Sequence, residues 1–151
     1  ITARVSRLED KVAHISERLE RLSDTVGYTL ENRALIALPK LLTQYGIEVT
    51  EPLVRKYVVV KNRQRQVNIY GHGRRGEQEV LIVGEAKVRP SRKEIARFVK
   101  LARMLAEAEQ REAVLLFVAH DFPPVIEEDL RAQGILPIWS YEIERLLLTT
   151  P

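Results

Sequence analysis

Apolar residues at the start of the chain recur at alternating steps of four and three. They fall into two series, Val5, Val12, Leu19 and Val26 in one and Ile1, Leu8, Ile15 and Leu22 in the other. This spacing is typical of a heptad seam, with the first series at a and the second at d. The mostly β-branched a positions favour a parallel dimer without excluding a trimer. An amphipathic helix lying on its own domain is the alternative, but flanking charges leave only a narrow apolar stripe. We therefore expect residues 1–27 to form a coiled-coil oligomerisation helix.

A second, wider apolar stripe follows Gly27 and predicts a helix that packs on a domain core. Its members are Leu30, Ala34, Leu35, Leu38, Leu41 and Leu42. Because Pro39 lacks a backbone donor, we expect the helix to kink or restart there. Gly46 is a plausible stop for this helix.

The rest of the chain alternates short apolar runs with amphipathic segments. The run at 113–119 has no polar alternation, which is typical of a parallel strand buried on both faces. We expect 71–76 to be a Gly-rich turn that joins the second and third strands as a hairpin. The pattern predicts strands at 53–60, 64–70, 79–86, 113–119 and 136–139, and helices at 92–109, 124–133 and 141–148, the last capped by Ser140. Residues 28–151 are thus expected to form one α/β domain.

Charge is distributed very unevenly along the 151 residues. Residues 53–103 carry 14 basic and four acidic side chains, a net +10, whereas the rest carries 10 basic and 17 acidic ones, a net −7. Such segregation favours a phosphate-rich partner, although an exposed face balanced by acidic neighbours in the fold is the alternative.

Composition restricts the compartment and the kinds of site that are expected for this chain. The chain has no Cys, which excludes disulfides and thiolate zinc sites and fits a reducing cytoplasm. No apolar run is long enough for a membrane span, so we expect no membrane association. The chain begins at Ile1 without an initiator Met, so we expect it to be part of a longer polypeptide.

The end of the strand at 79–86 carries the candidate chemistry. Alternation places Glu85 and Lys87 on the same face as Leu81 and Val83. A carboxylate and an ammonium at the end of an apolar face are costly unless they pair or bind something. On the preceding strand Gln66, Asn68 and Tyr70 are expected to share one face, so that Asn68 lies across from Glu85.

These residue types suit metal-assisted hydrolysis of a phosphodiester. Glu85, the Ala86 carbonyl and the Asn68 side chain can each supply an oxygen to Mg²⁺ or Mn²⁺, which retain water ligands. Lys87 would lie beside the attacking water. Glu31 precedes Ala34, Leu35 and Leu38 at helical steps, so its carboxylate is expected to approach the sheet. The alternative is a Glu at the edge of the stripe whose tip reaches solvent.

In this element order, these residues resemble the PD-(D/E)XK nuclease superfamily, and most closely its small prokaryotic members with an N-terminal coiled coil. The resemblance runs from about Tyr28 to the C-terminus and rests on Glu31, Asn68 and the triplet Glu85-Ala86-Lys87. It implies a restriction-endonuclease-like core, with a mixed central sheet flanked by helices and Mg²⁺ at the strand acids. It also implies an endonuclease acting on DNA rather than RNA, with basic side chains on the helix after the motif strand. The expected nucleic-acid-binding residues are Arg65, Arg74, Arg75, Arg89, Arg92, Lys93, Arg97 and Lys100.

Asn68 departs from the family pattern, which has Asp at this position. A neutral amide holds a dication less tightly than a carboxylate does. Three explanations stay open: a naturally weak or inactive nuclease, a deliberate inactivating substitution, or recruitment of another acid. The leading hypothesis is a dimeric metal-dependent endonuclease. The alternatives are a non-catalytic nucleic-acid-binding or scaffold module and a purely structural adaptor, which leaves the basic segment unexplained.

Overall fold

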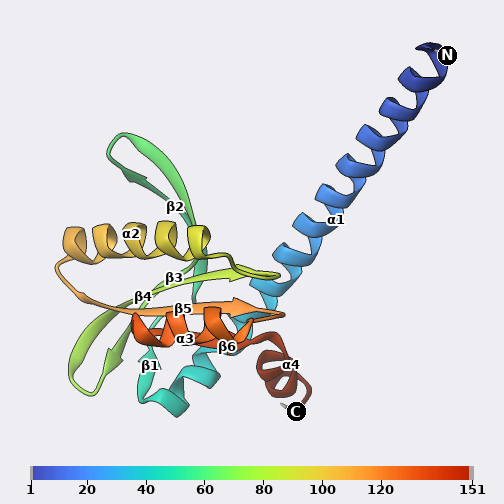
Figure 1. Cartoon of the computed structure of the whole chain (residues 1–151). Coiled ribbons are helices and arrows are strands. Elements are labelled where there is room, and N and C mark those ends of the chain that lie inside the picture. Colours follow the sequence, from blue (N-terminus) through green and yellow to red (C-terminus); the bar gives the residue numbers. More distant parts are fainter. Residues whose placement is uncertain (1, 150–151) are drawn as a thin grey trace.

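The computed structural model describes residues 2–149, apart from the side chains of residue 2 and residues 20–28. Within this range the chain is α/β, with one curled, mixed sheet flanked by helices (Figure 1). The elements are α1 Thr2–Leu42, the 3₁₀ turn η1 Thr43–Tyr45, β1 Ile47–Val49, β2 Val54–Val60, β3 Arg63–Arg75, β4 Gln78–Lys87, α2 Arg92–Glu109, β5 Glu112–Ala119, α3 Pro124–Ala132, β6 Ile135–Trp139 and α4 Ser140–Thr149.

The sheet has the order β1-β3-β4-β5-β6, and β2 pairs with the same edge of β3 as β1 does. β3 is antiparallel to β1, β2 and β4, whereas β4, β5 and β6 are mutually parallel. The parallel strand predicted at 113–119 is confirmed as β5. Because parallel strands end at the same edge, the carboxyl ends of β4, β5 and β6 lie together, where open α/β sheets commonly bind ligands.

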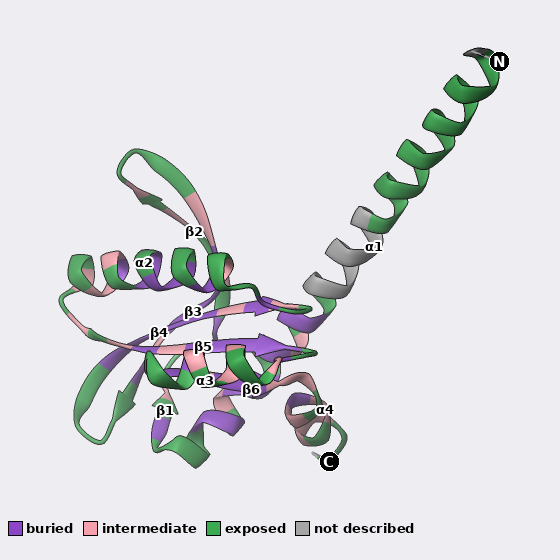
Figure 2. Ribbon diagram, in the orientation of Figure 1, coloured by how far each residue is buried: buried purple, intermediate pink, exposed green. Residues whose placement is uncertain are grey.

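Two apolar layers enclose the sheet. α1 and α4 cover one face, and α2 and α3 cover the other (Figure 2). Alternate residues of β4 divide between the layers: Ile82 packs with α1, whereas Leu81 and Val83 pack with α2. The two faces predicted for this strand are therefore confirmed, and Glu85 and Lys87 belong to the α2 side.

α1 is a single helix that projects far from the domain (Figure 1). Its C-terminal part buries the predicted stripe, including Leu30, Ala34 and Leu38. The helix continues through Pro39 to Leu42, so the expected restart is wrong. Only three residues follow Pro39, so little helix depends on the hydrogen bond lost there.

The projecting part of α1 exposes its apolar positions. Side chains from 3 to 19 are exposed, and the apolar ones are 48–62% exposed: Val5, Leu8, Val12, Ile15 and Leu19. The remaining predicted seam positions lie outside the described residues or among the undescribed side chains: Ile1, Leu22 and Val26.

The predicted Gly-rich turn at 71–76 is wrong, because β3 continues to Arg75. A Cβ on Gly73 would lie 2.4 Å from the Glu48 carbonyl oxygen, and one on Gly71 would lie 2.6 Å from Leu53. These glycines therefore allow β1 and the chain before β2 to approach β3 closely. The turn itself is shorter and contains Gly76, at φ +64°.

The three C-terminal helices begin close to where the sequence predicts. α2 starts with a capping box between Ser91 and Glu94. The prediction that Ser140 caps α4 is wrong: Ser140 Oγ lies 2.8 Å from His120 Nδ1, and Glu142 accepts the Trp139 N–H instead (2.8 Å). None of the helices described is long and apolar enough to span a membrane.

Candidate active site

The candidate site lies where the pairing between β3 and β4 ends. The paired ladder between these strands ends at Ile69 and Gly84. One position further, Asn68 Oδ1 accepts a hydrogen bond from the backbone N–H of Ala86 (3.1 Å). A buried side-chain amide thus takes the place of a backbone acceptor. Since the N–H and C=O of one strand residue point to the same side, the Ala86 carbonyl also faces Asn68.

A β-bulge gives Asn68 this orientation. Val54 pairs with Tyr70 and Lys56 with Val67, so three steps along β3 match two along β2. The extra residue shifts the alternation, and Val67 and Tyr70 both pack on the α2 side. The regular alternation expected for Gln66, Asn68 and Tyr70 is therefore interrupted within this stretch of β3. One step beyond the last β3–β4 pair, Ile69 and Gly84, Asn68 lies across from Glu85, as expected.

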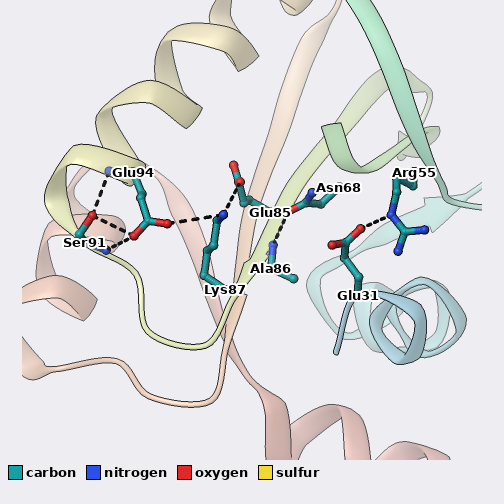
Figure 3. A network of polar contacts seen from close by, with 8 residues as sticks. All are labelled: Glu31, Arg55, Asn68, Glu85, Ala86, Lys87, Ser91 and Glu94. Atoms are coloured by element: carbon teal, nitrogen blue, oxygen red, sulfur yellow. Dashed lines mark hydrogen bonds and ion pairs between the residues drawn. The ribbon is translucent and has the colours of Figure 1, made fainter. Parts of the chain in front are cut away.

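Lys87 is held between two carboxylates at the end of β4 (Figure 3). Its Nζ lies 3.8 Å from Glu85 Oε1 and 3.6 Å from Glu94 Oε2. Glu94 is fixed because its other oxygen accepts from the Ser91 hydroxyl (2.9 Å). Glu94 was not among the predicted site residues, although the Ser-x-x-Glu signature of a capping box marks its position in the sequence.

Glu31 reaches the same region from α1. It is 5% exposed, so the alternative of a solvent-directed carboxylate is wrong. Arg55 of β2 donates to Glu31 from Nε and to Asn32 Oδ1 from its NH2 group (2.9 Å). No sequence pattern pointed to Arg55, because its position depends on how β2 pairs with the bulged strand.

Burial governs the electrostatics of the two carboxyl groups. Burial raises the pKa of Glu85 to about 7; Glu94 and Glu31 add to the rise, and Lys87 and Arg97 oppose it. Burial also raises the pKa of Glu31, against the hydrogen bond and charge of Arg55 and the charge of Lys87. The side chains predicted from separate parts of the chain therefore act on one another across one site.

The donor set is small for a metal ion. Within the described part of the chain, no three His, Cys, Asp or Glu side chains gather closely enough to hold a cation. The available oxygens are the Glu85 carboxylate, the Asn68 amide and the Ala86 carbonyl, and Arg55 offsets the charge of Glu31. Such a set fits Mg²⁺ or Mn²⁺ only as a weakly held ion that keeps several waters.

The predicted nucleic-acid-binding residues fall into separate regions. Those on α2 are exposed: Arg92, Lys93, Arg97 and Lys100. Arg89 follows β4 and pairs with Asp121 (3.4 Å). Arg65 lies on the β2–β3 hairpin. Arg74 and Arg75 are at the opposite end of β3, about 20 Å of strand from Asn68, and Arg75 pairs with Glu112 (3.3 Å).

His72 belongs to a separate polar cluster. It falls within the segment predicted to be a turn, but it lies in β3, between Glu51 and Glu109. Burial lowers the pKa of His72, but its hydrogen bonds to the two carboxylates outweigh burial and raise it overall. The Tyr70 hydroxyl also donates to Glu109, so the cluster ties β3 to the end of α2.

No family model, curated protein or solved structure matches this chain.

Proposed function

We propose that the chain is a metal-dependent DNA endonuclease-like protein with a restriction-endonuclease-like core, related to the PD-(D/E)XK nucleases. The observation that carries the proposal is the convergence of Glu31, Asn68, Glu85 and Lys87 at the end of β4 (Figure 3). These residues come from three elements, and the packing of a domain core does not require them to meet. The exposed basic side chains of α2 border the site and suit an anionic substrate.

In this proposal Glu85, the Asn68 amide oxygen and the Ala86 carbonyl hold Mg²⁺ or Mn²⁺. A bound divalent ion would supply charge stabilisation to the phosphate and acidity to a water. Glu85 must release its proton to act as a ligand, and the Lys87 ammonium 3.8 Å away favours that release. Metal affinity should therefore rise with pH through about pH 7, the pKa of Glu85.

Lys87 is the residue that would orient the attacking water. An ammonium has three donors. The Glu85 and Glu94 carboxylates lie 3.8 and 3.6 Å from it, which is ion-pair distance but longer than a hydrogen bond, so its donors can turn to a water or a phosphate oxygen. Glu94 then acts as a positioning residue, since its capping-box contacts fix the carboxylate beside Lys87. Glu31, held by Arg55, would anchor a metal-bound or attacking water from the α1 side.

A non-catalytic nucleic-acid-binding or scaffold module is the second candidate. Three observations favour it: Asn68 is neutral, its oxygen already accepts from Ala86, and Glu85 is largely protonated below its pKa of about 7. The first and third lower the negative charge available to a dication, and the second engages the amide oxygen that would bind it. In this reading the basic surface binds nucleic acid without turnover.

We further propose that the exposed stripe of α1 pairs with a second copy as a parallel coiled coil. An apolar row with five exposed members from Val5 to Leu19 is costly in a single chain. Self-association buries it without involving the domain, because the row lies on the projecting part of α1 (Figure 2). A dimer would carry two nuclease-like domains at one end of a common stalk.

Cleavage of plasmid DNA in Mg²⁺ or Mn²⁺ tests the proposed function. The comparison needs the wild-type chain, Asn68→Asp and Asn68→Asp/Glu85→Ala. We expect the first substitution to raise the cleavage rate at least tenfold and the second to abolish it. If all three are inert while DNA binding is intact and steeply salt-dependent, the non-catalytic module is selected instead.

A further inference from the structure

A cleft of about 220 Å³ lies between the β2–β3 hairpin and α2. The hairpin rises from the sheet beside α2 (Figure 1), and residues of both elements line the cleft. Four cationic side chains line the cleft together with three apolar ones, and no acid does: Lys61, Arg63, Arg65 and Lys100, with Val60, Leu101 and Met104.

The cations of this cleft have no ionic partners among the side chains that the structure describes. Within residues 2–149, none of the four makes an ion pair, whereas Arg75, Arg89 and Arg111 each pair with a carboxylate. Four like charges around one small cleft repel each other, which destabilises the empty site. An anionic ligand would remove this repulsion, so the arrangement is that of a binding site rather than of a balanced surface.

The turn of the hairpin supports a ligand-binding role. Lys61 and Asn62 both have positive φ angles, +51° and +62°. This conformation suits Asn or Gly, and it is unfavourable for Lys. The hairpin thus holds a Lys in the lining of the cleft in spite of its local backbone preference. Strain of this kind is typical of functional positions.

The three apolar side chains that line the cleft, which we call its apolar floor, narrow the class of ligand that the cleft can bind: Val60, Leu101 and Met104. A free phosphate would make no use of this apolar part of the lining. A base-paired duplex presents its phosphates outward and keeps its bases stacked inside, so it offers no base to this floor. An unpaired nucleotide offers a phosphate to the cations and an apolar base face to the floor, which is how single-stranded nucleic acids are commonly held.

We propose that the cleft holds one unpaired nucleotide of the strand bound at the Glu85 site, with its phosphate between the hairpin and α2. The assignment rests on the proposed function and names its substrate class, DNA with a single-stranded segment. The cleft and the site are on the same side of the sheet, because Val60, Leu101 and the β4 face of Glu85 belong to the α2 layer. Lys100 is eight residues beyond Arg92, about 12 Å along α2 from the helix start. A strand lying along α2 can therefore reach both places.

Fluorescence anisotropy in EDTA tests this assignment without involving cleavage. The probes are a labelled single-stranded oligonucleotide and a blunt duplex of the same length. The cleft variant is Arg63→Gln/Lys100→Gln. The control is Arg7→Gln/Arg131→Gln, which loses the same charge from exposed positions on α1 and α3. We expect the wild type to prefer the single strand, the cleft variant to lose about tenfold affinity for it, and the control to change little.

A second variant, Met104→Gln, tests the floor without changing charge. It should weaken single-strand binding and leave duplex binding unchanged, with an unaltered circular dichroism spectrum. If the wild type binds no nucleic acid, the proposed function fails and this inference fails with it. If it binds but the cleft variant matches the control, only the cleft assignment is overturned. Equal losses for single strand and duplex, or full competition by inorganic phosphate, overturn the unpaired-nucleotide assignment.

Discussion

The side-chain oxygen of Asn68 lies 3.1 Å from the backbone nitrogen of Ala86 and accepts its hydrogen bond, at the point where the β3–β4 ladder ends. This contact gives residue 68 a structural task that is independent of any metal. An amide and a carboxylate can both perform it, since either offers an acceptor oxygen. The two differ in the charge that they bring toward Glu85 and Glu31, and that difference can be measured.

Replacing Asn68 with Asp should make folding stability dependent on divalent metal. The carboxylate keeps the Ala86 hydrogen bond but adds a charge near two other acids. We expect a loss of about 1 kcal/mol in EDTA, and a larger rise in melting temperature on adding Mn²⁺ than in the wild type. Asn68→Leu should lose about 1–3 kcal/mol regardless of metal, because the Ala86 N–H is left unpaired. Equal Mn²⁺ shifts in all three proteins would contradict a metal site at residue 68.

Glu85 should give the protein a stability that decreases as pH rises. Burial raises its pKa to about 7 from an ordinary value of 4.5. Between these values the folded state holds a proton that the unfolded chain has released, so the Glu85 contribution to stability falls from about pH 4.5 to about pH 7 and then levels off. The full shift corresponds to about 3 kcal/mol.

Chemical denaturation across this pH range checks the prediction. Glu85→Gln should remove this contribution to the pH dependence and be the more stable protein at about pH 8, by roughly the same amount. Glu107→Gln, at an exposed position of α2, serves as the control and should follow the wild type. If the wild type and Glu85→Gln show the same pH dependence between pH 5 and pH 7, Glu85 is ionised in the fold and the prediction is wrong.

Substituting Lys61 with Asn should separate stability from binding. Asn tolerates the left-handed backbone conformation at φ +51° better than Lys, so the melting temperature should rise, by the equivalent of about 0.5–1 kcal/mol. The same change removes one cation from the cleft and should weaken binding of a single strand several-fold. Thermal denaturation and anisotropy on one preparation measure both. A variant that binds as tightly as the wild type would remove Lys61 from the site.

The stripe on α1 should determine the oligomeric state. Ile15 is a d position of the predicted heptad and is 56% exposed in the single chain. Ile15→Asp should convert a dimer into a monomer, because two carboxylates would meet in the apolar seam. His14→Asp, one residue away at a c position, should leave the dimer intact. Sedimentation equilibrium distinguishes these outcomes, and a monomeric wild type would contradict the coiled coil.

Local patterns predicted the elements whose signals are contained in one segment. α2 begins after a Ser-x-x-Glu capping box, and β5 is an unbroken apolar run, so both lie close to their expected bounds. Glu31 was predicted to approach the sheet because helical spacing alone places it on the buried stripe.

Features that depend on distant partners were not predictable in this way. β1 has only three residues, and it pairs with β3 because Gly73 leaves room for the Glu48 carbonyl. The bulge in β3 has no sequence signature, yet it determines which way Asn68 points. The contact between Arg55 and Glu31 also depends on this bulge, because the bulge determines how β2 pairs with β3. The residues of the site were thus predictable by type and spacing, whereas the contacts that hold them were not.

The location of Mn²⁺ in crystals grown with the metal tests the central claim most directly, through its anomalous scattering. The account predicts one peak within coordination distance of the Glu85 carboxylate, the Asn68 amide oxygen and the Ala86 carbonyl, and a stronger peak in Asn68→Asp. Crystals at saturating Mn²⁺ with no peak between Asn68 and Glu85, in either protein, would contradict a metal-dependent nuclease site at the end of β4.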